Sequence, residues 1–148
     1  MKIRCLFIFI VITCYSCNKN DSSTNNPQPN TTNNLLVKWK YDHWEKNGVL
    51  QNLSSCDKNG YVQFNSNGTF ERKDYWLMSN TCVIEGEENG TYTFNSTTKK
   101  ITLVFNDISQ GPQTEIWNNV ELTDKALKFS WDENKDGNDE HLIGYIKY

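Results

Sequence analysis

The chain has 148 residues, of which 15 are Lys or Arg and 18 are Asp or Glu, giving a formal net charge of −3. This acidic balance argues against a nucleic-acid partner, because phosphate recognition requires clustered Lys and Arg. The lysines, such as Lys99 and Lys100, come singly or in pairs near predicted turns and form no basic patch.

Residues 1–16 carry the pattern of a secretory signal peptide. Lys2 and Arg4 precede an apolar run from Leu6 to Ile12, and small or polar residues follow. The alternative is a transmembrane helix, which needs roughly 20 apolar residues, about twice the length of this run. We therefore expect the chain to be exported.

Two cysteines end this segment, and Cys17 is the better candidate for a lipid anchor. Ser16 before Cys17 resembles the lipobox of bacterial lipoproteins, in which a small residue precedes the cysteine that is acylated. Cys14 instead follows the branched Thr13. The alternative is that both cysteines are only apolar residues of the signal.

The cysteine count supports the same choice. Cleavage before Cys17 removes Cys5 and Cys14, and acylation of Cys17 leaves Cys56 and Cys82 as an even pair, as expected in an oxidising compartment. We therefore expect the lipid on Cys17 to hold the protein in the cell envelope, at the outer membrane rather than the inner one. The sequence does not decide whether the protein is exposed at the cell surface or whether it binds a protein partner in the envelope.

Residues 18–34 contain no aliphatic or aromatic side chain and consist mainly of Asn, Ser, Thr, Pro and Gln. Such a segment buries too little apolar surface to offset its ordering entropy, so we predict that 17–34 form a lipidated cysteine and a flexible tether. The remaining residues, 35–148, suit one domain with a core of its own.

Alternation of apolar and polar residues recurs along 35–148, and no window has a helical stripe, so we predict an all-β domain. Asn67-Gly68 supplies the positive φ angles of one tight turn, and "EKNG" at 45–48 turns the chain earlier. The predicted strands and hairpins, in chain order, are 35–44, 61–76, 90–105, 114–122, 126–131 and 141–148.

About eight strands joined by short loops favour a closed, eight-stranded antiparallel up-and-down barrel, with an open sandwich as the main alternative. An outer-membrane barrel is disfavoured, because segments such as "TFERKDYW" at 69–76 carry charges on both faces.

Three stretches resemble the lipocalin-like domains of secreted bacterial lipoproteins. They are the first strand "LLVKWKYDHWEKNG" with Trp39, the "FNSNGTF" hairpin at 64–70 and the "GTYTF" strand at 90–94. The resemblance covers nearly all of 35–148 and implies a lipocalin-like up-and-down barrel whose interior holds a small apolar ligand. Lipocalins usually have Gly two positions before the first-strand Trp, where this chain has Val37.

Cys56 and Cys82 flank the first predicted hairpin, which would bring them close together at its open end. Export favours a disulfide between them, and two free buried thiols are the alternative.

The segment "DENKDGNDE" at 132–140 resembles a calcium loop in part. Asp132, Asn134 and Asp136 stand at positions one, three and five, and Gly137 follows. Position twelve, however, is Ile143 instead of Glu, so we predict a polar hairpin loop that turns at Asp136-Gly137. A weak surface cation site is the alternative.

Catalytic patterns are missing from the sequence. His43 and His141 have no partner spacing for a metal, and there is no phosphate-binding loop, serine elbow or zinc motif. We therefore predict no catalytic residue, no enzyme activity and no cofactor.

Aromatic residues of the predicted strands are the remaining clue to function. They could line a cavity for a small apolar ligand, or fill a barrel that is only just wide enough for side chains. The first case predicts a ligand-binding lipoprotein, and the second a non-catalytic interaction or structural module with a solid core. The candidate ligand-binding residues are Trp39, Phe64, Phe70, Tyr92, Phe94 and Trp117, and Phe129 and Trp131 share their pattern.

Overall fold

The computed structural model describes residues 34–148. The predictions for the signal peptide, for Cys17 and for the tether up to residue 33 lie outside the described residues. Among residues 34–148, no helix is long and apolar enough to cross a membrane.

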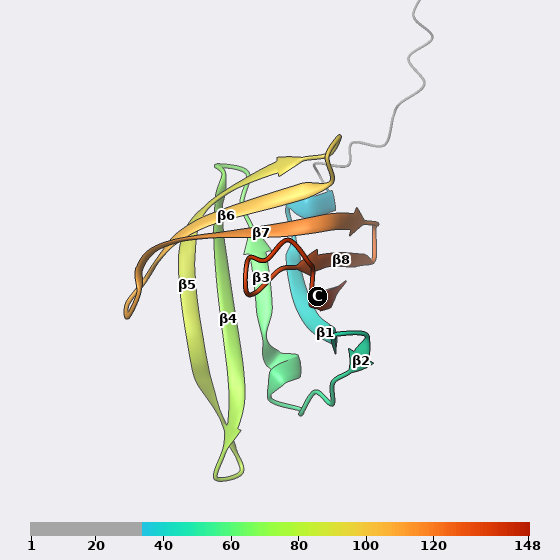
Figure 1. Ribbon diagram of the computed structural model, residues 1–148. Coiled ribbons are helices and arrows are strands. Elements are labelled where there is room, and N and C mark those ends of the chain that lie inside the picture. Colours follow the sequence, from blue (N-terminus) through green and yellow to red (C-terminus); the bar gives the residue numbers. More distant parts are fainter. Residues whose placement is uncertain (1–33) are drawn as a thin grey trace, which may run out of the picture.

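Residues 34–148 contain nine antiparallel strands and one short 3-10 helix, preceded by the helical residues 34–35 (Figure 1). The elements, in chain order, are β1 (Lys38–Lys46), β2 (Val49–Leu50), η1 (Asp57–Asn59), β3 (Tyr61–Phe64), β4 (Thr69–Met78), β5 (Thr81–Asn95), β6 (Lys100–Asp107), β7 (Gly111–Leu122), β8 (Ala126–Trp131) and β9 (His141–Lys147).

Eight of the strands close into a barrel. Successive strands from β3 to β9 pair with their chain neighbours, β3 pairs with β1, and β1 also pairs with β9 from Trp39↔Lys147 to Lys46↔His141. β2 pairs with β1 alone. The predicted eight-stranded up-and-down barrel is confirmed. Because β1 pairs with β9, the two edges of the sheet are joined, unlike those of an open sandwich.

Most of the observed strands lie where the alternation of apolar and polar residues predicted them. β8 has the predicted bounds, and the turn between β3 and β4 has Gly68 at φ 82°. The first strand begins at Lys38 instead of residue 35, because residues 34–35 are helical and a bend at 36–37 follows them; Leu35 is fully buried. The indole N–H of Trp39 donates to the carbonyl oxygen of Leu35 at 3.1 Å, which fastens this segment over one end of the barrel.

β4 and β5 form a long hairpin that extends beyond the rest of the barrel (Figure 1). Its outer part includes residues 81–89, for which the sequence predicted no strand. Cys56 lies just before η1 and forms a disulfide with Cys82 of β5, with their Cα atoms 5.2 Å apart. The predicted disulfide is therefore confirmed, and it ties the loop before β3 to this hairpin.

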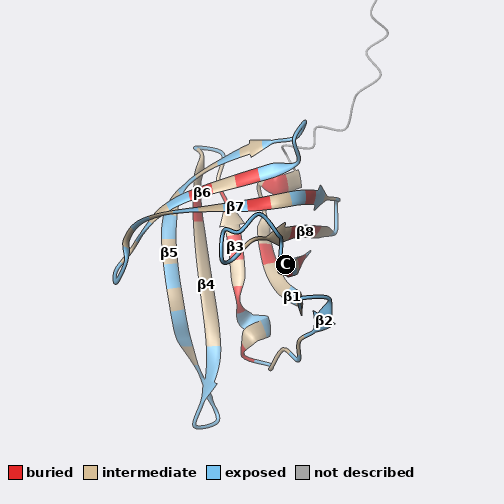
Figure 2. Cartoon of the chain, in the orientation of Figure 1, coloured by how far each residue is buried: buried red, intermediate tan, exposed pale blue. Residues whose placement is uncertain are grey.

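A solid aromatic core fills one end of the barrel. Figure 2 shows the buried residues gathered toward that end, while the far parts of β4 and β5 are half-buried or exposed. Trp117 and Phe129 stack with ring centroids 3.7 Å apart and ring planes 2° apart. The largest buried side chains of this core include Leu35, Trp39, Phe64, Phe70, Trp117 and Phe129.

Candidate functional site

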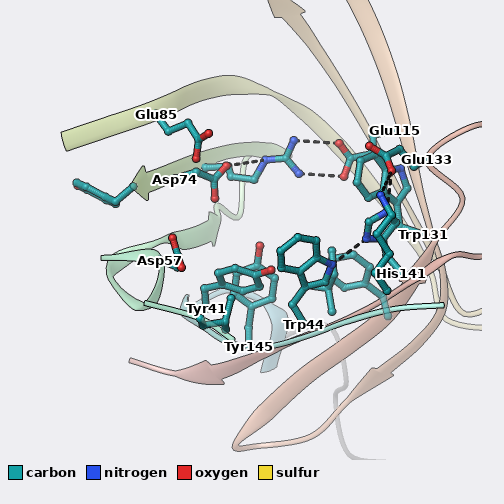
Figure 3. A pocket seen from close by; sticks show the side chains of 16 residues that line it. Tyr41, Trp44, Asp57, Asp74, Glu85, Glu115, Trp131, Glu133, His141 and Tyr145 are labelled. Atoms are coloured by element: carbon teal, nitrogen blue, oxygen red, sulfur yellow. Dashed lines mark hydrogen bonds and ion pairs between the residues drawn. The ribbon is translucent and has the colours of Figure 1, made fainter. Parts of the chain in front are cut away.

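The other half of the barrel is hollow, with a cavity of about 480 Å³ (Figure 3). Phe129 and Tyr145 belong to the core and also line the cavity, so their rings, with centroids 6.1 Å apart, form its floor. Apolar side chains supply part of the wall: Trp44, Leu53, Trp131 and Ile143.

A β-bulge positions two of the wall residues. The pairing of β1 with β9 shifts between Tyr41 and His43, so that Asp42 is an extra residue in β1. A bulge reverses the inward and outward alternation of a strand. Tyr41 lines the cavity before the bulge, and Trp44 and Lys46 line it after the bulge.

Arg72 of β4 is buried in the barrel between two carboxylates. Its two terminal nitrogens donate to the two carboxylate oxygens of Glu115 on β7, both at 2.9 Å, and its Nε donates to Glu88 on β5. Burial by itself would lower the pKa of Arg72, but Glu115 and Glu88 raise it well above its ordinary value. Trp117 also donates its indole N–H to Glu115 and so links this ion pair to the core.

The same contacts keep Glu115 ionised. Burial alone would raise the pKa of Glu115, but the charge of Arg72 and the hydrogen bonds from Arg72 and Trp117 lower it below its ordinary value. A buried guanidinium and carboxylate with this bidentate geometry are fully charged and hold each other in place.

Asp74 lies two residues after Arg72 on the same face of β4. Its side chain faces the cavity and makes no hydrogen bond to the described residues. Its nearest cationic atom is Nε of Arg72, at 4.0 Å. Desolvation raises the pKa of Asp74 to about 6; Arg72 opposes this shift, and Glu88, Glu85 and Glu115 add to it. The carboxylate of Asp74 is therefore ionised at neutral pH but poorly compensated.

Two tyrosines face Asp74 across the cavity. The rings of Tyr41 on β1 and Tyr145 on β9 lie 5.4 Å apart, and Figure 3 shows both hydroxyls on the side toward Asp74. Burial raises the pKa of each phenol, and the negative charge of Asp74 raises it further. Both phenols are therefore protonated, and neither makes a hydrogen bond to the described part of the chain.

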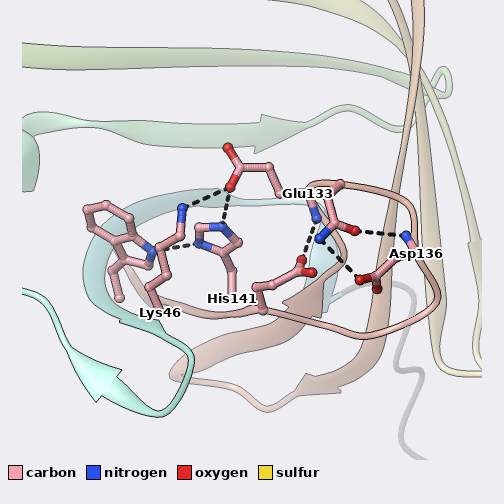
Figure 4. Close-up of polar contacts among 7 residues, drawn as sticks. Lys46, Glu133, Asp136 and His141 are labelled. Carbon is pink, nitrogen blue, oxygen red and sulfur yellow. Dashed lines mark hydrogen bonds and ion pairs between the residues drawn. The ribbon is translucent and has the colours of Figure 1, made fainter.

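A hydrogen-bonded cluster stands at the side of the cavity (Figure 4). Trp44 donates its indole N–H to Nδ1 of His141 at 2.8 Å, and Nε2 of His141 lies 2.9 Å from Glu133, which also binds Lys46 at 3.0 Å. An indole N–H can only donate, so Nδ1 carries no proton. His141 is therefore the neutral tautomer, with its proton on Nε2 toward Glu133.

The segment 132–140 forms the predicted polar loop between β8 and β9, and Gly137 has φ 96°. Carboxylate oxygens of Asp132, Asp136 and Glu140 lie within 4.8 Å of one another. They accept backbone N–H groups of the loop itself, for example from Gly137 to Asp132 at 2.9 Å. Asn134 also donates to Asp136, which is labelled in Figure 4. These contacts account for the turn without assigning the loop a function.

The six aromatic residues proposed from the sequence lie elsewhere. Trp39, Phe64, Phe70 and Trp117 are buried in the core, and Tyr92 and Phe94 are half-buried against it. None of the six lines the cavity. The physical reason is the narrow interior of an eight-stranded barrel, in which large rings at one end fill the space completely.

Sequence reasoning missed the charged lining because charged residues of a strand are usually solvated. One signal was available: Phe70, Arg72 and Asp74 alternate along β4 and must share a face until the β-bulge after Asp74. A strand that turns Phe70 inward therefore also turns Arg72 and Asp74 inward.

Known proteins show the same architecture. A lipocalin-like protein from Bacteroides uniformis superposes with a TM-score of 0.53 and 15% identity, over 78% of this chain and 99% of that one. An uncharacterized protein from Bacteroides eggerthii superposes with a TM-score of 0.51 and 17% identity, over 77% of this chain and 99% of that one. No curated protein matches the sequence. Residues 35–129 match the family described as "Lipocalin-like domain", and the chain therefore belongs to the lipocalin-like family.

Proposed function

We propose that this protein is a non-catalytic lipoprotein that binds a small molecule in the hollow half of its barrel. The observation that carries the proposal is the cavity of about 480 Å³, a volume within the range of small-molecule sites. Its walls combine aromatic rings with two polar groups that make no hydrogen bond to residues 34–148, the hydroxyl of Tyr145 and the carboxylate of Asp74.

The lining changes the expected ligand. The sequence predicted a small apolar molecule, but charged and phenolic groups occupy much of the wall beside Trp44 and Trp131. A ligand with an apolar body and at least one polar group fits this surface better, because a bound ligand would cover these polar groups, and polar groups that become buried need hydrogen-bond partners.

Native mass spectrometry of the protein purified from its own membrane tests ligand binding. Gly86 of β5 offers a way to fill the cavity, since a Cβ atom added there meets only the carboxylate of Asp74, at 3.9 Å. We expect a reproducible small-molecule adduct on the natural protein, and its loss in Gly86→Leu. Thr93→Leu, on the exposed face of the same strand, is the matched control and should keep the adduct.

An adduct that persists in Gly86→Leu would place the ligand outside the cavity. The absence of any adduct, together with no quenching of tryptophan fluorescence by small aromatic probes, would overturn ligand binding.

The membrane anchor is part of the same proposal and is supported by the sequence around Cys17 and by the polar residues that follow it. Acyl chains on Cys17 would hold the barrel at a membrane of the cell envelope, with the outer membrane as the proposed site. Cys17→Ala should move the protein from the membrane fraction to the soluble fraction, whereas Cys14→Ala should not. Continued acylation of Cys17→Ala would show that another residue is the anchor.

A second candidate function, docking of another cell-envelope protein, is favoured by the end of the β4–β5 hairpin. Four apolar side chains there are 46–53% exposed: Trp76, Leu77, Met78 and Ile84. Strand alternation and the pairing of Ile84 with Tyr75 put Trp76 and Met78 on one face of the hairpin and Leu77 and Ile84 on the other, so each face offers a pair of exposed apolar groups to a partner. Cross-linking in cells should yield a defined complex that is lost in Leu77→Ser/Met78→Ser and kept in Gly86→Leu; the opposite pattern would exclude docking at the hairpin.

A further inference from the structure

The charges around the cavity do not balance. Two cationic side chains, Lys46 and Arg72, and five carboxylates line it: Asp57, Asp74, Glu85, Glu115 and Glu133. The excess of carboxylates gives the cavity a negative electrostatic potential. Charges in a partly buried site interact more strongly than they do in water.

Both cationic side chains are already engaged. Lys46 pairs with Glu133, and Arg72 donates three hydrogen bonds, two to Glu115 and one to Glu88. An anionic ligand would therefore have to displace a bidentate carboxylate from Arg72. The guanidinium positions Glu115 and Glu88 and is poorly available to a ligand anion.

Asp74 and Tyr145 are left with unused hydrogen-bonding capacity. Tyr145 is only 5% exposed, its ring is fixed in the floor of the cavity, and its hydroxyl has no partner among residues 34–148. Asp74 faces the same space, makes no hydrogen bond to residues 34–148, and has the Nε of Arg72 as its ion-pair partner at 4.0 Å. A group that donates hydrogen bonds and carries positive charge would satisfy both.

Apolar surface surrounds this polar end of the cavity. The rings of Trp44 and Trp131 and the side chain of Ile143 lie in the wall beside Tyr145. Indole faces attract cations as well as apolar groups, so they can cover the body of a ligand next to its charged end.

We infer that the cavity selects organic cations, namely an ammonium or amidinium group on an apolar body, with Asp74 pairing with the cation and the hydroxyl oxygens of Tyr41 and Tyr145 accepting its N–H groups. This inference rests on the proposed function, because it assigns a ligand class to the same cavity. The wall formed by Trp44 and Trp131 would contact the apolar body.

Three probes with one aromatic ring and different charge test the inference by isothermal titration calorimetry of the purified full-length protein at pH 7.5. They are phenethylamine, 2-phenylethanol and 3-phenylpropionate. We expect the Kd of phenethylamine to be at least tenfold lower than that of 2-phenylethanol, and 3-phenylpropionate to bind most weakly.

Two variants locate the charge that makes the difference. Asp74→Asn should raise the Kd of phenethylamine to that of the alcohol and leave the Kd of the alcohol within about twofold, since the amide keeps the shape of the carboxylate and loses its charge. Asp124→Asn, in the exposed turn between β7 and β8, is the matched control and should change neither value.

The outcomes separate the two proposals. Equal or tighter binding of the alcohol or the acid would overturn cation selection while leaving the cavity a binding site. Undiminished binding of phenethylamine by Asp74→Asn would overturn the assignment of Asp74. No binding of any probe to the natural protein, together with no co-purified adduct, would overturn the proposed function itself.

Discussion

The buried ion pair of Arg72 offers a test of how the hollow half of the barrel is held together. Arg72→Met keeps most of the apolar stem but leaves Glu115 and Glu88 without their cation. The side chains of these three residues are only 12%, 12% and 21% exposed. Removing one partner of a buried pair costs about 3–5 kcal/mol, because the other charge stays desolvated.

At about 4 °C per kcal/mol for a domain of this size, the melting temperature of Arg72→Met should fall by about 12–20 °C. Urea denaturation of Arg72→Met, Glu115→Gln and the double variant completes a thermodynamic cycle. The double variant should be more stable than the sum of the single losses predicts, with a coupling of about 1.5–3 kcal/mol. Lys73→Met is the control on the opposite face of β4, where Lys73 pairs with Glu87 at the surface, and should change the midpoint little.

A loss below about 1 kcal/mol in Arg72→Met, or losses that simply add in the double variant, would refute this reasoning, because either result means that Glu115 is solvated or finds another partner.

Three further variants or treatments probe other parts of the fold. Reduction of the disulfide, which closes a loop with a sequence separation of 26, should lower the free energy of unfolding by about 3.5 kcal/mol in the loop-entropy model, and an unchanged urea midpoint after verified reduction would contradict this. Gly90→Ala places a Cβ atom 2.1 Å from the backbone oxygen of Val104 and should cost about 2–4 kcal/mol, whereas Gly86→Ala, whose Cβ atom makes only an ordinary contact with Asp74 at 3.9 Å, should not. Because burial raises the pKa of Asp74 to about 6, ionising it opposes folding as the pH rises from about 4 to about 6. Asp74→Asn should therefore be more stable than the natural protein at pH 7.5, by about 1 kcal/mol once the 43% exposure of the side chain is allowed for, and no more stable at pH 4; equal differences at both pH values would contradict the raised pKa.

The core end of the barrel follows from the sequence because the buried residues of the core cluster are apolar. In β8, Leu127 and Phe129 are buried and alternate with the exposed Lys128, and the strand has the predicted bounds. Trp39 likewise points into the core from β1. Where one face of a strand is apolar and the other is exposed to solvent, the period of two predicts both that the segment is a strand and which of its faces turns toward the core.

The outer part of β5 could not be predicted in this way. Residues 81–89 are rich in acidic side chains, and their pairing depends on β4, where Lys73 lies opposite Glu87 and Arg72 opposite Glu88. Opposite charges across two strands stabilise such a hairpin, but neither strand shows an apolar stripe on its own. The outer part of β5 can be recognised as a strand only from its pairing with β4, and the residue pattern of one segment carries no information about its pairing partner.

The hollow half shows why the candidate site was the least predictable part. Strict alternation from Trp39 and Tyr41 would turn His43 and Glu45 inward, yet these two side chains bind each other at 2.8 Å and lie outside the set that lines the cavity. The bulge at Asp42 exchanges them for Trp44 and Lys46. A one-residue bulge leaves no mark in composition and only shifts the phase of the alternation, but it reverses the face of every later residue in the strand. The bulge at Asp42 is therefore the reason why the alternation of residues does not predict the cavity lining. The same bulge turns the indole ring of Trp44 into the cavity that Asp74 and Tyr145 also line, so the chemistry of the cavity depends on a feature that the pattern did not predict.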